Sequence, residues 1–284
     1  MSQEVLPEVF VFPNSVRVAN IDLDFLRKSS MIRSSGSNNP GPLRPLQSWE
    51  LIDQLENLMN SISLPFQRKE IWVEKKNSNR ILTNEEVELY TPENTPINKW
   101  VFDHVLTKFE IIPESIREGY APAIALSFTQ SGIKVVWGLH VHVCQNLCIF
   151  GENSISTYGR DKIPFAKQMN LLEFWIQNVE EKYKEDLAIM DRMKSKAIDT
   201  LWVNECIGDL YRMAINKAYK KGEAPLNTAN LSILVQKLNP ESLSIVWDFY
   251  NAGTEIIKPT NISIEDVFNV NMSWGKYLSE KATI

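Results

Sequence analysis

The longest stretch of the sequence without a helix-breaking residue begins after Pro164 and contains neither proline nor glycine as far as residue 201. Proline and glycine most often end or interrupt helices, so their absence permits one long helix. Apolar residues recur there mostly in steps of four and three, the spacing of one helix face. We therefore expect a single helix over about 163–201, with a seam like that of a coiled coil. The seam residues are Leu172, Ile176, Val179, Tyr183, Met190, Met193 and Ala197, with Leu187 in the middle turn.

The chain before about residue 160 has a different character, because short apolar segments alternate with turns rich in Pro, Asn, Ser or Gly. Such segments predict strands. Strands followed by helices predict an α+β fold, with a strand-rich, mainly antiparallel N-terminal half packed on a helical C-terminal half. The expected strands cover 67–76, 80–83, 100–112, 121–129 and 133–143, and the further helices cover 48–62, 203–221, 227–237, 240–257 and 263–281.

Residues 28–47 are rich in Ser, Asn, Gly and Pro and contain few bulky apolar side chains. Such a segment cannot bury enough surface to offset its ordering entropy, which predicts a mobile loop or an arm that folds against a partner. The loop lies far from residue 160, so no linker separates the two halves. We therefore expect residues 1–284 to form a single cooperative domain, with mainly strands over 1–160 and mainly helices over 161–284.

The composition resembles that of a cytoplasmic protein. The formal net charge of −5 and a pI near 5.4 give no overall attraction to nucleic acid. Cys144, Cys148 and Cys206 show no disulfide pattern, and the N-terminal residues lack the features of a signal peptide. No segment approaches the roughly 18 apolar residues of a membrane span, so we expect no contact with membranes.

Two segments carry a resemblance to a known family. Residues 132–151, GIKVVWGLHVHVCQNLCIFG, form an alternating strand that runs into a Cys-x-Asn corner. Residues 247–258, WDFYNAGTEIIK, contain a Tyr-Asn-Ala-x-Thr-Glu run. Together they resemble the phage- and plasmid-like family catalogued as domain of unknown function 932. The signature positions are Cys144, Asn146, Tyr250, Asn251, Thr254 and Glu255.

The resemblance implies a setting rather than a reaction. Members of the family occur in phage, plasmid and other mobile genomes, which implies a role in the element's DNA metabolism, its assembly or its contest with the host. The signatures also have structural explanations. Asn146 suits a turn that ends a strand, whereas Asn251 and Glu255 lie one helical turn apart and predict a buried polar link to the sheet.

His140, His142 and Cys144 form the strongest candidate for a metal site. Their spacing of two places them on one strand face, and imidazole and thiolate groups bind zinc. Alternatively, the histidines are polar residues on a partly exposed sheet face, and the cysteines are small core residues. The second interpretation is favoured, so no cofactor is expected and zinc is the alternative. No phosphate-loop, dinucleotide, zinc-protease or nucleophile-elbow motif occurs, so no catalytic residue is predicted.

Basic and aromatic residues gather on the first expected hairpin. Proteins that bind single-stranded nucleic acid combine cations for the phosphates with aromatic rings for the bases. Solvated protein surfaces show the same mixture, so both interpretations stay open. The cluster consists of Arg68, Lys69, Trp72, Lys75, Lys76 and Arg80.

These features support three functions. The first is a non-enzymatic DNA-transaction protein that binds or anneals single-stranded DNA. The second is a virion-associated or host-interaction (anti-defence) protein with phage or host proteins as partners. The third is a metal-dependent enzyme built on the His140, His142 and Cys144 strand. The apolar seam over 172–197 needs a cover, which is either the strand-rich half of the same chain or the same helix of another subunit. The second is favoured, so we expect a homo-oligomer whose interface includes part of 172–197.

Overall fold

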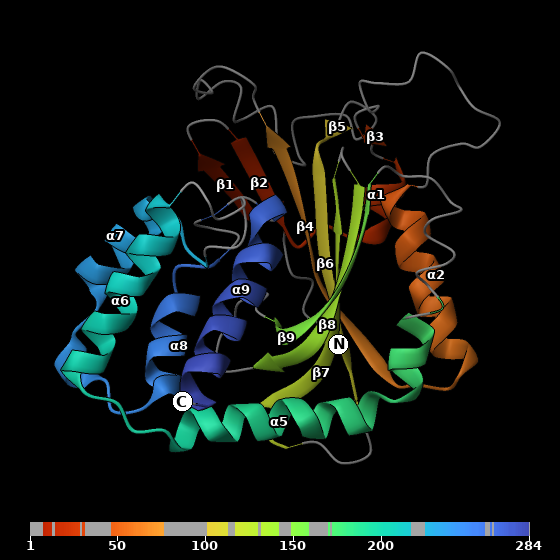
Figure 1. Cartoon of the computed structure of the whole chain (residues 1–284). Coiled ribbons are helices and arrows are strands. Elements are labelled where there is room, and N and C mark those ends of the chain that lie inside the picture. Colours follow the sequence, from red (N-terminus) through yellow and green to blue (C-terminus); the bar gives the residue numbers. More distant parts are fainter. Residues whose placement is uncertain are drawn as a thin grey trace. The chain divides into compact units, whose positions relative to one another are not determined.

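The computed structural model describes residues 8–12, 15–28, 30–31, 47–76, 101–112, 117–129, 132–141, 149–158, 170, 172–216, 225–258, 262 and 264–283. Within these ranges, strands predominate before residue 160 and helices after it (Figure 1). The predicted α+β class is confirmed, because an antiparallel sheet forms in the N-terminal half and helices form in the C-terminal half.

Seven of the described strands form one sheet. They are β1 (Glu8–Phe12), β2 (Ser15–Ala19), β4 (Phe66–Lys76), β6 (His104–Ile111), β7 (Tyr120–Phe128), β8 (Gly132–Val141) and β9 (Ile149–Tyr158). Their order in the sheet follows their order along the chain, and the pairs β1–β2, β2–β4 and β4–β6 are antiparallel. Two short strands, β3 (Ser30–Met31) and β5 (Val101–Phe102), pair in parallel outside this sheet.

Most helices of the described ranges follow residue 170. In chain order, the helices are α1 (Leu23–Lys28), α2 (Ser48–Ser61), α5 (Val179–Ser195), α6 (Thr200–Ile215), α7 (Thr228–Lys237), α8 (Val246–Thr254) and α9 (Ile264–Thr283), with a 3₁₀ turn at Pro240–Ser242. Residues 172–177 are also helical. None of these helices combines the length and the apolar character needed to cross a membrane.

The chain divides into two compact units. The first unit consists of Met1–Ile112, Ile124–Val136 and Ser154–Gln177, and the second consists of Pro113–Ala123, Trp137–Asn153 and Asn178–Ile284. The division falls within strands β7, β8 and β9 rather than near residue 160. The sequence predicts that the whole chain unfolds as one cooperative unit. Because cooperativity is a property of unfolding, it stays a prediction.

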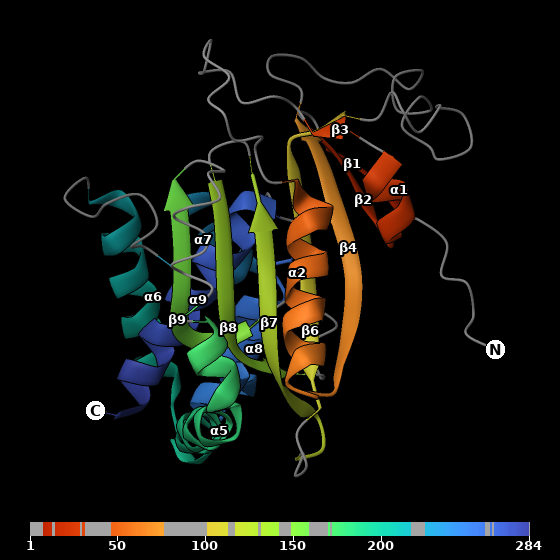
Figure 2. The same ribbon diagram turned by 90° about the vertical axis from the view of Figure 1, so that its right-hand side faces the viewer.

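The sheet of the first unit has one apolar face, on which α2 lies (Figure 2). Side chains alternate along β4, and Ile71 and Val73 are buried on the α2 side. Arg68, which precedes a bulge in β4, reaches Glu56 of α2 from this face. The buried side of α2 carries Leu51, Ile52, Leu55 and Met59, at helical spacing.

In the second unit, α8 and α9 lie side by side, and α5 packs against both (Figure 1). Helices α6 and α7 form another neighbouring pair. Each of these helices buries only part of its surface, which is typical of amphipathic helices. Helix α6 contacts α7 and is tied to α9, and these neighbours decide which side of α6 stays exposed.

The single long helix predicted over 163–201 is wrong, because α5 ends at Ser195 and α6 begins at Thr200. Between them the chain is extended and pairs with residues 244–246, through an Ile198 N to Ser244 O bond of 2.9 Å and a Val246 N to Lys196 O bond of 3.0 Å. The side chain of Asp199 then accepts a hydrogen bond from Trp202 N and caps α6. Backbone pairing with a distant segment thus interrupts the helical pattern.

The predicted seam of the long helix is largely buried within a single chain. Val179, Tyr183, Met190 and Met193 are all buried in α5, whereas Ala197 is exposed in the extended segment. This burial removes the reason to place an oligomer interface on α5.

The predicted loop at 28–47 begins too early. Lys28 ends α1, and residues 30–31 form β3; residues 32–46 lie outside the described ranges. Besides β3, two more strands were not expected from the sequence. Strand β2 follows β1 after only two residues, and β9 has a largely polar sequence that lacks an apolar run.

Candidate functional site

The predicted metal strand is only partly visible. His140 lies near the end of β8 and is buried, whereas His142, Cys144, Asn146 and Cys148 fall outside the described ranges. No group of three or more His, Cys, Asp and Glu side chains able to hold a metal ion occurs in the part of the chain that the structure describes. The expected absence of a cofactor stays a prediction, and zinc on this strand stays its alternative.

The basic residues predicted to bind DNA lie beside carboxylates. Each cation of β4 whose side chain is described has an acidic partner from a neighbouring element. The pairs are Arg68–Glu56 at 2.6 Å, Lys69–Glu110 at 2.7 Å and Lys75–Asp103 at 3.6 Å. Phosphate groups would have to compete with these carboxylates. The side chain of Lys76 and all of Arg80 lie outside the described structure.

The aromatic member of the same cluster is not available for stacking on a base. Trp72 is buried, and its ring stacks on Phe10 of β1 at a centroid distance of 5.3 Å. Its Nε1 donates a 2.9 Å hydrogen bond to Glu70. A base could reach the ring only if this packing opened.

The face of the sheet opposite α2 carries a charged network that the sequence analysis missed. Arg17, Glu74 and His104 are direct neighbours on β2, β4 and β6, and all three are buried. Arg17 Nε donates to Glu74 Oε1 at 2.8 Å, and His104 Nδ1 lies 2.9 Å from Glu74 Oε2. In the sequence, the available signal for this network was charged residues at alternating strand positions. The strand register, which brings the three residues together, cannot be read from one strand alone.

The electrostatics of this network indicate a structural role. Burial would raise the pKa of the Glu74 carboxyl, but the hydrogen bond with His104 and the charge of Arg17 outweigh it and lower the pKa to about 2. A general base works best with a pKa near the operating pH, and this carboxylate is far below neutrality. Glu74 therefore holds three strands together as a charged acceptor.

The residues of the family-like signature on α8 have structural contacts. Tyr250 is buried, and its carbonyl accepts a 3.0 Å hydrogen bond from Trp274 Nε1 of α9. Thr254 Oγ1 donates to the Asn251 carbonyl within the same helix. Glu255 is exposed and pairs with Lys258, so the predicted buried polar link to the sheet is wrong for this residue.

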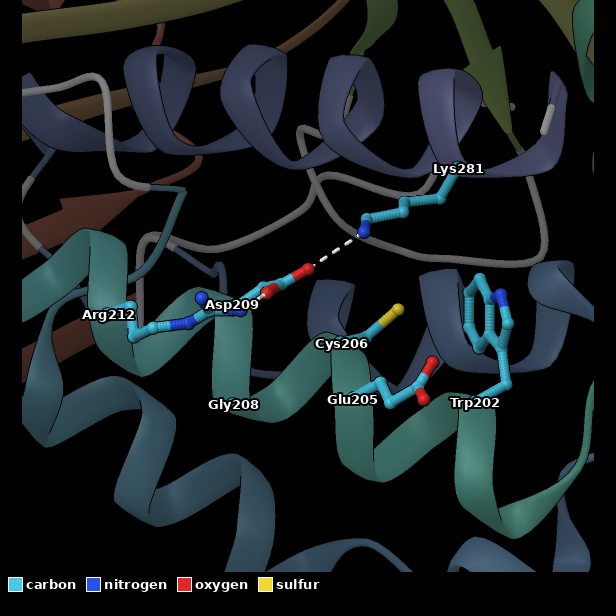
Figure 3. Close-up of a pocket in the computed structure, with 7 residues that line it drawn as sticks. All are labelled: Trp202, Glu205, Cys206, Gly208, Asp209, Arg212 and Lys281. Atoms are coloured by element: carbon cyan, nitrogen blue, oxygen red, sulfur yellow. Dashed lines mark hydrogen bonds and ion pairs between the residues drawn. The ribbon is translucent and has the colours of Figure 1, made fainter.

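A pocket of about 430 Å³ lies between α6 and α9 (Figure 3). Lys281 of α9 reaches across it to Asp209 of α6 at 2.8 Å. This hydrogen bond lowers the pKa of the Asp209 carboxyl and raises that of the Lys281 ammonium. The lining residues are Trp202, Glu205, Cys206, Gly208, Asp209, Arg212 and Lys281.

Cys206 is the pocket residue with nucleophilic chemistry, but its environment opposes reaction. The side chain is buried, and burial raises the pKa of its thiol. Since the thiolate is the reactive form, a raised pKa leaves less nucleophile at neutral pH. The Tyr277 hydroxyl bonds the Cys206 carbonyl, which further fixes α9 on α6.

We expect Cys206 to react with a chromogenic disulfide reagent at least about tenfold more slowly in the folded protein than in the urea-unfolded chain. A variant carrying Cys144→Ser and Cys148→Ser leaves Cys206 as the single thiol of the sequence. Absorbance of the released thiolate measures the rate. Equal rates in the two states would show that the thiol is accessible and would reopen a nucleophilic role.

The exposed side of α6, which shares Glu205, Gly208 and Arg212 with this pocket, carries two unusually exposed apolar side chains. Leu201 and Ile215 are 66% and 67% exposed, the highest values among the large hydrophobic side chains that the structure describes. Glu205, Gly208 and Arg212 lie between them and are exposed too. We call these five residues the α6 stripe.

The α6 stripe follows alternating steps of four, three, four and three residues, so its members occupy one side of the helix. The opposite side carries the buried Val203, Cys206 and Leu210. Two large apolar side chains at the ends of one exposed stripe are a feature of contact surfaces for other molecules. This stripe is therefore the candidate functional site.

Comparison with protein-family models, with curated protein sequences and with solved structures finds no match to this chain. The resemblance of the two sequence segments to the phage- and plasmid-like family thus stays a prediction.

Proposed function

We propose that this protein is a non-enzymatic interaction protein of a phage- or plasmid-like element and that it binds another protein chain through the α6 stripe. The observation that carries the proposal is the exposure of Leu201 and Ile215, which are 66% and 67% exposed on one side of one helix. An exposed leucine alone is ordinary on a protein surface. Two such residues on the same stripe, with charged residues between them, suit a protein partner that offers both apolar and charged groups.

The charge distribution favours a protein partner over DNA. Binding to a nucleic acid depends on cations that replace counterions along the phosphates. On β4, the cations Arg68, Lys69 and Lys75 each lie beside a carboxylate. The stripe itself offers one cation, Arg212, together with one anion, Glu205. Binding or annealing of single-stranded DNA is therefore the alternative function, and a test must distinguish it from protein docking.

The proposal places the protein in the host cytoplasm or in the virion, where its partner is another copy, a phage protein or a host protein. Catalysis is not part of the proposal. The buried Glu74 network and the buried Cys206 thiol both have structural explanations, and a metal-dependent reaction on the His140 strand would need separate support.

Site-specific photo-crosslinking tests the proposal. A benzophenone amino acid is placed at Leu201 or at Ile215, and Ile112, which is 45% exposed in the first unit, serves as the matched control position. We expect light-dependent adducts to protein at both α6 positions, in the cells that produce the chain, and none at the control. If the α6 stripe is a docking surface, the benzophenone group at position 201 or 215 lies within the contact and reacts with the partner.

Two outcomes contradict the proposal. Adducts that disappear after nuclease treatment would favour the DNA role. Equal and minimal labelling at positions 112, 201 and 215 would show that the stripe contacts no macromolecule.

A further inference from the structure

The order of residues in the α6 stripe is self-complementary. Reading along the helix gives Leu201, Glu205, Gly208, Arg212 and Ile215. The two apolar ends lie seven residues on either side of the glycine, and an acid and a base lie between them on opposite sides. A second helix with the same sequence, running in the opposite direction, would place each group against a suitable partner.

Helix dimensions support this match quantitatively. At a rise of about 1.5 Å per residue, Leu201 and Ile215 lie about 10.5 Å from Gly208 in opposite directions along the axis. Glu205 lies about 4.5 Å before the glycine and Arg212 about 6 Å after it. With a two-fold axis near Gly208, Leu201 would face the partner copy's Ile215, and Glu205 would face the partner copy's Arg212 within one residue.

Gly208 makes no close packing contact with the residues that the structure describes. A Cβ atom added at this position would meet nothing within 4 Å. Glycine weakens a helix relative to alanine, so its presence in the middle of α6 has a cost that no contact among the described residues explains. At a crossing point, glycine permits the closest approach of two helix backbones.

The charges of the stripe are accessible for pairing with another chain. The Arg212 side chain is 81% exposed and contacts Asp209 of its own helix, while Asp209 is also held by Lys281. Because Asp209 already has Lys281, Arg212 can turn outward without leaving that carboxylate without a cation. Glu205 is exposed about two turns before Arg212, where an arginine from an antiparallel helix would arrive.

We propose that the partner at the α6 stripe is a second copy of this chain, bound as an antiparallel two-fold pair that crosses at Gly208. This inference rests on the proposed docking role of the same stripe and names its occupant. Two helices of 16 residues bury less than the roughly 1,200 Å² of a standard interface, so the dimer is weak and forms as the concentration rises.

Charge reversal tests the pairing directly. Sedimentation velocity is measured over a concentration series on the full chain and on three variants: Glu205→Arg, Arg212→Glu and the double exchange. We expect each single reversal to weaken dimerisation by at least about tenfold, because like charges then face each other. The double exchange restores the opposite charges and returns the dissociation constant to near that of the unchanged chain. Circular dichroism checks that these exposed substitutions leave the fold unchanged.

Gly208→Gln adds a steric test. A Cβ atom at position 208 meets nothing within 4 Å, so we expect the folded monomer to be retained while the longer side chain blocks the close approach of two helices. A control substitution, Lys184→Gln, changes an exposed residue of α5 outside the stripe and leaves dimerisation unchanged.

The results separate the two proposals. A chain that stays monomeric at all concentrations, or a double exchange that fails to restore association, overturns the second copy as the partner. Photo-crosslinks from position 201 to a different protein would then still support the docking role. If crosslinking also fails, the docking role falls with it.

Discussion

Replacing Gly253 with alanine is expected to lower the free energy of unfolding by about 3 kcal/mol, because the added methyl group overlaps a buried indole. A Cβ atom at this position would lie 2.3 Å from Cε2 and 2.4 Å from Cζ2 of Trp274. The indole is fully buried, and its Nε1 is fixed by a 3.0 Å bond to the Tyr250 carbonyl. The Phe249 ring lies edge-on against it at 5.3 Å, which leaves the indole little space to move away.

A double-mutant cycle measured by urea unfolding checks this cause. Trp274→Ala alone is expected to cost about 3–5 kcal/mol through loss of a buried aromatic side chain. In that background, Gly253→Ala should cost less than about 1 kcal/mol, since the indole with which it clashes is gone. Gly208→Ala is the matched control, because its Cβ meets nothing, and it should be neutral or stabilising by up to about 1 kcal/mol. Equal costs for the two glycine substitutions would refute the close contact with Trp274.

Replacing Glu74 with glutamine is expected to cost about 3–5 kcal/mol at pH 7, because it removes the charge from a buried ion pair. The substitution keeps the shape of the side chain but removes the carboxylate that Arg17 and His104 contact. The matched control is Glu56→Gln. The Arg68 and Glu56 side chains are 30% and 25% exposed, so this partly exposed pair should contribute less than about 1 kcal/mol.

The same network predicts how stability depends on pH. The pKa of Glu74 is about 2 in the folded protein, against an ordinary value of 4.5, so the folded state favours the charged form. The resulting stability, about 3 kcal/mol, is present above pH 4.5 and is lost as the pH falls towards 2. Chemical unfolding at pH 6, 4 and 3 measures the loss. The Glu74→Gln variant should show a shallower fall over this window, and a fall as steep as that of the unchanged chain would contradict the assignment to Glu74.

Much of the secondary structure could be predicted from periodicity within each element. The expected strand at 121–129 and the expected helix at 227–237 agree with β7 and α7 to within one residue. In α7 the buried Leu231 and Leu234 lie at helical spacing, and β7 is a short, mostly apolar run that is buried throughout, so a short window of sequence contains the signal in each case. The change from strands to helices near residue 160 follows for the same reason.

The boundaries of the long helix were decided by tertiary structure. Residues 172–197 have a helical pattern that continues towards 201, and no proline or glycine marks an end. The chain nevertheless leaves the helix after Ser195, because Lys196 and Ile198 bond to residues 244–246. That partner segment lies almost 50 residues further along the chain, a separation that a local pattern cannot report.

The candidate site shows the same division between sequence and tertiary structure. The sequence alone predicts a helix over 203–221 in which Gly208 and Ile215 share one side, but it assigns Leu201 to the preceding helix. It cannot determine which side is covered, because that depends on where α7 and α9 pack. The charged network at Glu74 and the contact of Gly253 with Trp274 likewise join residues from separate elements. Residue identity and spacing determine the elements, whereas packing between distant segments decides which residues are buried, paired or left exposed to a partner.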